Sequence, residues 1–119
     1  MGLILNSFEH TNSKLGLALL LDTPLTEIED YLSLKQVNLI QLMSIKKIGH
    51  HGEVFAEAVL EKIKALKKMW PAGLIQVDGG INLETAKAAK TAGATSLAVG
   101  SSLWQAPSFV EELNKFKNI

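Results

Sequence analysis

Residues 74–82 read Leu-Ile-Gln-Val-Asp-Gly-Gly-Ile-Asn, and residues 96–102 read Ser-Leu-Ala-Val-Gly-Ser-Ser. In each stretch an apolar run typical of a buried strand is followed closely by glycine, and the first run ends in the carboxylate of Asp78. In parallel α/β sheets, functional groups gather at the carboxyl ends of the strands, where backbone N–H groups can bind phosphate. The first stretch therefore predicts an acid–base or metal-binding carboxylate, and the second predicts a phosphate-binding turn.

Four apolar runs along the chain predict strands. We expect these strands at Leu17–Leu21, Asn38–Met43, Leu74–Val77 and Ser96–Val99. Each run is nearly continuous in apolar residues, which is typical of strands that are covered on both faces.

A helix-like segment follows each of the four runs. The first is a short helix that we expect Thr26 to cap, and the second covers residues 55–66, where apolar side chains recur at helical spacing. The third helix is bounded by Asn82 and Gly93, and the fourth covers residues 108–116. This alternation predicts an α/β fold with parallel strands, the (βα)4 half of a TIM (β/α)8 barrel. We expect a single half-barrel domain over residues 1–119, in which 1–13 is a remnant helix and 14–119 form four βα units.

Composition excludes several classes of function. The 12 basic and 12 acidic residues give a formal charge of zero, so no field favours nucleic acid or a membrane surface. The chain has no cysteine, which excludes disulfides, thiol nucleophiles and cysteine-based metal sites. The longest apolar stretch, residues 15–21, is too short to span a bilayer, and Met1–Leu5 lacks the features of a signal peptide. We therefore expect a cytoplasmic protein.

Several short motifs follow one another in a fixed order: Gly16-Leu17-Ala18-Leu19, Thr23-Pro24, Met43-Ser44, Val59-Leu60-Glu61-Lys62-Ile63, Val77-Asp78-Gly79-Gly80-Ile81-Asn82 and Gly100-Ser101. In order and spacing they resemble the C-terminal half of the ribulose-phosphate 3-epimerases, which are (β/α)8 barrels. The resemblance runs from about Lys14 to the C-terminus. The Asp-Gly-Gly motif alone is weak, since several phosphate-binding barrels carry similar turns.

The resemblance implies an activity and a set of site residues. It implies epimerisation at C3 of a pentulose phosphate, between D-ribulose 5-phosphate and D-xylulose 5-phosphate, with Asp78 as catalytic acid–base group and as ligand of a divalent metal ion (zinc, iron, manganese or cobalt). In that chemistry a metal stabilises the ene-diolate while carboxylates on either face exchange the proton. The resemblance further implies that the substrate phosphate is bound by Gly49, Gly52, Gly79, Gly80, Gly100 and Ser101.

The chain departs from the family pattern at three places. It has no His-x-Asp motif, which the first barrel half supplies in the family. Residues 47–53 read Lys-Ile-Gly-His-His-Gly-Glu where Pro-Gly-Phe-Gly-Gly-Gln is usual, and Leu20 stands where asparagine is usual. Half a barrel also leaves two strand edges unpaired and its apolar inner face, including Leu17–Leu21, exposed. We therefore expect a homodimer or a complementing N-terminal half-barrel, and an incomplete catalytic site in the chain alone.

Other interpretations stay open at this stage. The chain could be a non-catalytic sugar-phosphate-binding remnant, or another phosphate-binding barrel enzyme such as a thiamine-phosphate synthase-like protein. Asp78 could be a turn residue that bonds its own backbone. Trp70 and Trp104 are expected to be core or interface anchors, Lys46 or Lys47 could neutralise a bound phosphate, and His50 and His51 are expected in a solvated loop. The remaining expectation is a solvated lysine face on the second helix, formed by Lys62, Lys64, Lys67 and Lys68.

Overall fold

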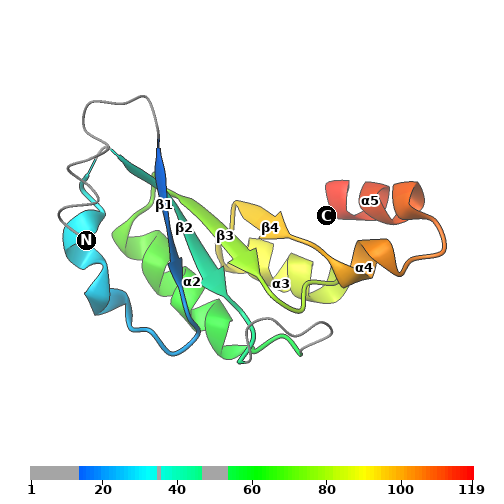
Figure 1. The fold of residues 1–119 in the computed structure, drawn as a ribbon, viewed down its shortest axis with the longest axis horizontal. Helices are drawn as coiled ribbons and strands as arrows, with labels where there is room; N and C mark the ends of the chain where they lie inside the picture. Colours follow the sequence, from blue (N-terminus) through cyan, green and yellow to red (C-terminus); the bar gives the residue numbers. More distant parts are fainter. Residues whose placement is uncertain (1–13, 35, 47–53) are drawn as a thin grey trace.

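The computed structural model describes residues 14–34, 36–46 and 54–119. Four strands form one sheet in the order β1-β2-β3-β4, and each strand pairs in parallel with the next (Figure 1). Their bounds are β1 Leu15–Leu19, β2 Val37–Met43, β3 Leu74–Asp78 and β4 Ser96–Ala98. The predicted α/β fold with four parallel strands is confirmed and is consistent with part of a TIM barrel. The expected remnant helix at residues 1–13 lies outside the described residues.

Six helical segments connect or follow the strands: η1 Leu25–Glu27, η2 Glu29–Tyr31, α2 Ala58–Met69, α3 Leu83–Ala92, α4 Ser101–Trp104 and α5 Phe109–Lys117. The predicted cap of α3 is confirmed, because the Asn82 side chain accepts a hydrogen bond from the Thr85 N–H at 2.9 Å. The Thr85 hydroxyl in turn accepts one from the Asn82 N–H at 2.8 Å, which completes a capping box. Gly93 ends the same helix with φ +125°.

The cap expected for the short helix after β1 was wrong. The segment forms two 3-10 helices, and Thr26 lies inside the first of them instead of capping it. Pro24 precedes η1, and the bonds from Ile28 N–H to Leu25 C=O and from Tyr31 N–H to Ile28 C=O span three residues each. Such bonds close the tighter 3-10 turn.

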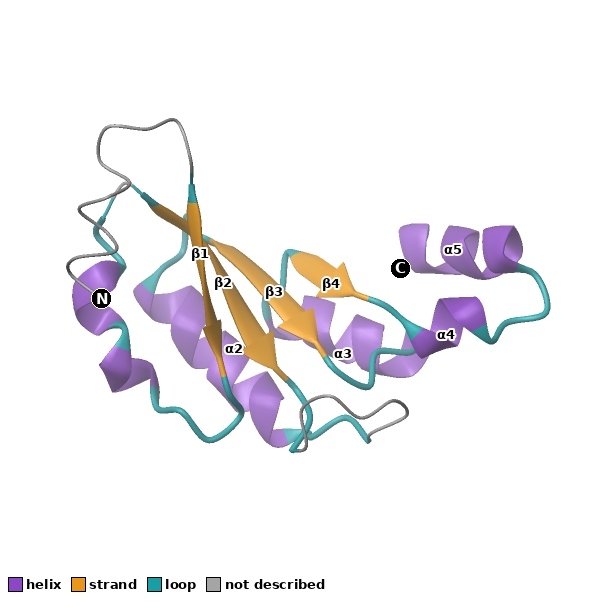
Figure 2. Cartoon of the chain, viewed as in Figure 1, coloured by secondary structure: helices purple, strands orange, loops and turns teal. Residues whose placement is uncertain are grey.

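Helices α2 and α3 lie together on one face of the sheet (Figure 2). The side chains that point toward them are buried in a common core that includes Leu17, Leu19, Ile40, Leu42, Val59, Ile63, Leu66, Ile75, Val77, Ala86 and Ala89. Alternate residues, such as Gly16, Ala18 and Leu74, are exposed, so the expectation of cover on both faces was wrong for the described residues. Leu17 and Leu19 therefore belong to the core and not to the uncovered face.

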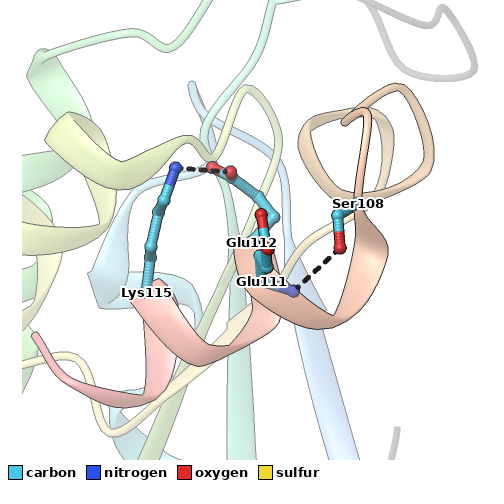
Figure 3. A network of polar contacts seen from close by, with 4 residues as sticks. All are labelled: Ser108, Glu111, Glu112 and Lys115. Atoms are coloured by element: carbon cyan, nitrogen blue, oxygen red, sulfur yellow. Dashed lines mark hydrogen bonds and ion pairs between the residues drawn. The ribbon is translucent and has the colours of Figure 1, made fainter.

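The chain continues past β4 into α4 and α5 (Figure 1). The Ser108 hydroxyl accepts a hydrogen bond from the Glu111 N–H at 3.4 Å, which confirms the predicted start of α5, and Lys115 pairs with Glu112 at 3.2 Å (Figure 3). Helix α4 was not predicted. Its Trp104 ring lies 4.9 Å from that of Phe109 and is 77% exposed, so Trp104 is not a core residue, whereas Trp70 packs against the core. No helix in the described ranges has the length and apolar character needed to cross a membrane.

Candidate functional site

Asp78 is the last residue of β3 and lies on the sheet face opposite α2 and α3. The alternation along β3 places it there, because Ile75 and Val77 are buried in the core. In register, Asp78 is paired with Met43 at the end of β2 and with Ala98 at the end of β4. Its carboxylate is half-buried, and no hydrogen bond or ion pair to it occurs among the described residues. Asp78 therefore offers a carboxylate at the carboxyl end of the sheet.

Ser44 joins the end of β2 to the turn after β3. Its backbone N–H donates to the Asp78 carbonyl at 2.9 Å, and its hydroxyl donates to the Gly79 carbonyl at 2.5 Å. The Ser44 carbonyl accepts the Ala56 N–H at 2.7 Å. Ser44 is completely buried and is the only buried polar residue in the described part of the chain. The sequence showed a polar residue directly after an apolar strand, but not that this residue fixes the backbone around Asp78.

Gly79 and Gly80 both take backbone conformations that favour glycine, with φ +128° and +66°. A Cβ on Gly79 would lie 2.8 Å from Ile45 Cγ2 and 3.1 Å from the Ser44 hydroxyl oxygen. The Thr85 hydroxyl donates to the Gly80 carbonyl at 3.1 Å, which ties the turn to the first turn of α3. The conformation of the turn therefore accounts for glycine at both positions.

Gly100 differs from the first glycine pair. It precedes α4, and its φ of −114° is not in the left-handed region that Gly79 and Gly80 occupy. A Cβ added to Gly100 would meet no atom of the described residues within 4 Å. The protein's own packing therefore does not require glycine at this position, and the space beside it is open. Ser101, the next residue, is half-buried and begins α4.

The two glycine-containing turns follow the neighbouring strands β3 and β4 and begin at the same, carboxyl end of the sheet (Figure 1). The structure thus brings Asp78, Gly79, Gly80, Gly100 and Ser101 to the carboxyl end of the sheet. The other two predicted phosphate-binding residues, Gly49 and Gly52, lie outside the described residues, as do Lys47, His50 and His51. Lys46 is described and is exposed just after the end of β2.

A polar ladder crosses the uncovered face one layer below Asp78. The Ser96 hydroxyl donates to Gln76 Oε1 at 2.9 Å, and Gln76 Nε2 donates to Gln41 Oε1 at 2.6 Å. Gln41 Nε2 reaches the sulfur of Met43 at 3.3 Å. Gln41, Gln76 and Ser96 are direct register partners on three adjacent strands. Sequence reasoning missed this ladder because each of its residues stands alone within an apolar run.

Asp78 does not form a metal site with the other described residues. Within ranges 14–34, 36–46 and 54–119, no three histidine or acidic side chains gather closely enough to hold a metal ion. One carboxylate is a single ligand, whereas catalytic metals are commonly held by three protein groups. The described residues therefore do not fit a resident metal, and we assign no chemical step to one.

Two lysines of the predicted solvated face make backbone contacts instead. Lys62 donates to three carbonyl groups of the loop after β1, and Lys67 donates to the Pro71 carbonyl at 3.0 Å. Lys64 and Lys68 are exposed, as expected. The solvated-face interpretation was therefore wrong for Lys62, because the fold brings the carbonyls of the loop after β1 within hydrogen-bond distance of its ammonium group.

Comparison with known proteins places this chain in a family. Residues 2–104 match the sequence model of the ribulose-phosphate 3 epimerase family. This chain belongs to that family. It is 31% identical over 104 residues to the cytoplasmic isoform of ribulose-phosphate 3-epimerase from Oryza sativa subsp. japonica, a match that covers 87% of this chain and 45% of the rice protein.

Two further epimerases give the same result. The chain is 38% identical over 96 residues to ribulose-phosphate 3-epimerase of Bacillus subtilis, covering 76% of this chain and 43% of that protein. It is 30% identical over 103 residues to the Schizosaccharomyces pombe enzyme, covering 87% and 44%. The chain thus spans less than half the length of the curated relatives that it matches.

Proposed function

We propose that this chain supplies the C-terminal part of a ribulose-phosphate 3-epimerase site, in which Asp78 transfers a proton at C3 of a pentulose phosphate. The observation that carries the proposal is the position of Asp78. It ends a central strand, faces away from the helices, and its backbone is held by the buried Ser44. A carboxylate fixed in this way can act as a general acid or base if the substrate carbon lies within hydrogen-bond reach.

The turns after β3 and β4 would hold the phosphate group of the substrate. Gly79, Gly80, Gly100 and Ser101 stand at adjacent strand ends, where backbone N–H groups can bind an anion. Gly100 supports this role most directly, because its missing side chain leaves open space that the fold itself does not use. Exposed Lys46 at the same edge would add positive charge.

Epimerisation needs further groups beside Asp78. A proton must leave one face of the substrate and return on the other, so a second acid–base group must stand opposite Asp78. A resident divalent metal would likewise need ligands in addition to Asp78. We propose that these groups come from an N-terminal half-barrel or from a second copy of this chain, in a cytoplasmic setting.

The geometry of the sheet supports such completion. β1 and β4 each pair with one strand among the described residues, so each has a free edge. A cavity of about 690 Å³ lies between β4 and α5. Its lining is mostly apolar and includes Leu97, Val99, Leu103, Leu113, Phe116 and Ile119, with Lys90 and Lys117 among its polar residues. An added strand could pair with β4 and place its side chains in this cavity.

Activity measurements test the proposal. Interconversion of D-ribulose 5-phosphate and D-xylulose 5-phosphate would be followed with the chain alone and with an N-terminal half-barrel of a family member added. We expect activity in the reconstituted sample and its loss, by a factor of at least about 100, in the Asp78→Asn variant. Asp30→Asn, which removes an exposed carboxylate in η2, is the matched control and should keep full activity. Activity that survives Asp78→Asn would refute the assignment.

The alternative is a binding protein without catalysis. It is favoured by the single carboxylate of the site and by the lack of a three-residue metal cluster among the described residues. In that case calorimetry would detect ribulose 5-phosphate binding that Gly100→Val weakens, while no sample shows turnover. If Gly100→Val binds as tightly as the parent, the phosphate site lies elsewhere.

A further inference from the structure

The loop between β1 and η1 is held in place from a distant helix. Lys62 of α2 donates from Nζ to the Leu20 carbonyl at 2.8 Å, to the Leu21 carbonyl at 3.1 Å, and to the Thr23 carbonyl. An ammonium group has three protons, so these three acceptors use its whole donor capacity. The loop closes on itself as well, because the Thr23 N–H donates to the Leu20 carbonyl at 3.1 Å.

Lys62 differs from the other lysines of α2 in its surroundings. It is half-buried beside the core residue Ile63, and this burial lowers the pKa of its ammonium group, while the nearby Asp22 carboxylate raises it. Lys64, two residues further along, is exposed and pairs only with Glu61 of the same helix, at 3.1 Å. A half-buried ammonium group that donates all its hydrogen bonds to one loop holds that loop in place, whereas an exposed ion pair contributes little to stability.

The loop that Lys62 holds is one wall of a cavity at the carboxyl end of the sheet. This cavity has a volume of about 430 Å³ and is lined by Leu20, Leu21, Asp22, Ile45 and Lys46. Its opposite wall belongs to the segment after β2. Ile45 of that wall also meets the turn after Asp78, because it lies beside Gly79. The cavity and the Asp78 turn therefore share a wall.

We propose that Lys62 is a positioning residue for the sugar-phosphate site, acting by holding the loop at residues 20–23 in the conformation that forms one wall of this cavity. The proposal rests on the proposed function for its ligand, a phosphorylated pentulose. Lys62 would be a further residue of the site, on the side of the sheet that the helices cover. It does not touch the ligand, and it acts through its hydrogen bonds to the loop carbonyls. Preorganisation of this kind lowers the ordering cost of binding.

Hydrogen exchange tests the anchor without any ligand. In the Lys62→Met variant, we expect the Thr23 amide, which donates to the Leu20 carbonyl, to exchange at least about tenfold faster, because the charge-assisted hydrogen bonds that hold this loop are lost. Lys64→Met is the matched control and should leave this amide unchanged. The amides of α3 show whether each variant is still folded as a whole. If Lys62→Met does not fold, Lys62→Gln, which keeps donors but not the charge, replaces it. Unchanged exchange at Thr23 in a folded variant overturns the proposal.

Ligand binding tests the functional half of the proposal. Calorimetry with D-ribulose 5-phosphate should give a Kd about tenfold weaker for Lys62→Met than for the parent and the Lys64→Met control, with partial recovery in Lys62→Arg. Equal Kd values for all variants would overturn the positioning role. If the parent itself does not bind, the proposed function fails, and the exchange experiment alone then decides whether Lys62 anchors the loop.

Discussion

Replacement of Gly79 by alanine tests whether the fold itself requires glycine at this position, independently of any ligand. Gly79 has φ +128°, a conformation that residues with a side chain rarely adopt. The new Cβ would also lie 2.8 Å from Ile45 Cγ2 and 3.0 Å from Ile45 Cγ1. Ile45 is buried, so it cannot move away without disturbing its own packing.

The two costs can be estimated separately. An unfavourable backbone conformation costs about 1–3 kcal/mol, and overpacking in a filled site costs about 1–3 kcal/mol. We therefore expect Gly79→Ala to lower the free energy of unfolding by about 2–6 kcal/mol. For a urea dependence of about 1–2 kcal/mol/M, the midpoint of unfolding should fall by at least about 1 M.

Urea unfolding followed by circular dichroism measures this loss, and a double-mutant cycle identifies its source. Ile45→Ala removes both atoms that the new Cβ would approach, so the Gly79→Ala/Ile45→Ala pair should show a coupling of about 1–3 kcal/mol. A loss below about 0.5 kcal/mol for Gly79→Ala alone would show that the turn tolerates a side chain. The reasoning about this glycine would then be refuted.

Gly100→Ala is the matched comparison at the neighbouring strand end. Its Cβ would meet no atom of the described residues within 4 Å, so no steric clash adds to the cost, and we expect a smaller fall in the free energy of unfolding than for Gly79→Ala. A weaker affinity for ribulose 5-phosphate that exceeds this loss of stability would then point to a requirement of the ligand. A loss as large as that of Gly79→Ala would contradict the structure at this position.

Three further predictions concern groups that hold the site in place. Ser44→Ala leaves the Gly79 carbonyl without its side-chain donor, so the free energy of unfolding should fall by about 1–3 kcal/mol in chemical denaturation; a valine there, which adds volume to a fully buried position, should cost no less. Asn82→Ala removes the cap of α3 and should cost about 1 kcal/mol, with Asn82→Ser recovering most of it in the same assay. Burial lowers the pKa of Lys62 in the folded state, so above neutral pH the unfolded chain binds more protons at this residue than the folded chain does. The free energy of unfolding of the parent, relative to that of Lys62→Met, should therefore rise as the pH increases from 7 toward the ordinary lysine pKa of 10.5. Denaturation at several pH values measures this difference, and a flat or falling difference would contradict the prediction.

The sequence predicted the parts of the fold that depend on local patterns. The apolar run ending in Asp78 and the asparagine that begins α3 were both found where expected, because burial periodicity and capping are encoded within a few residues. The 3-10 turns after β1 and the short helix α4 were missed, because segments of three or four residues carry almost no periodic signal. The observed strand ends differ from the predicted ones by up to two residues, because the boundaries of an element carry less signal than its interior.

Features that join distant segments were out of reach of sequence reasoning. Lys62 has the spacing of a solvated lysine, and only the fold brings loop carbonyls about 40 residues away in sequence to its ammonium group. Gly79 and Gly100 looked equivalent as glycines after strands, yet one is required by Ile45 and a positive φ, and the other is not required by any described neighbour. Asp78 was expected at the end of its strand, and the structure has it as the last residue of β3; the sheet face on which it lies became evident only from the burial of Ile75 and Val77.

The order of the sheet has a consequence for how this chain acquires its structure. Since the spatial order β1-β2-β3-β4 repeats the order of synthesis, no strand has to insert between two strands already formed. Each new strand and its helix can dock on the unit made just before, at a small cost in loop closure. Folding can therefore proceed progressively while the chain emerges from the ribosome, with each nascent edge covered by the next unit.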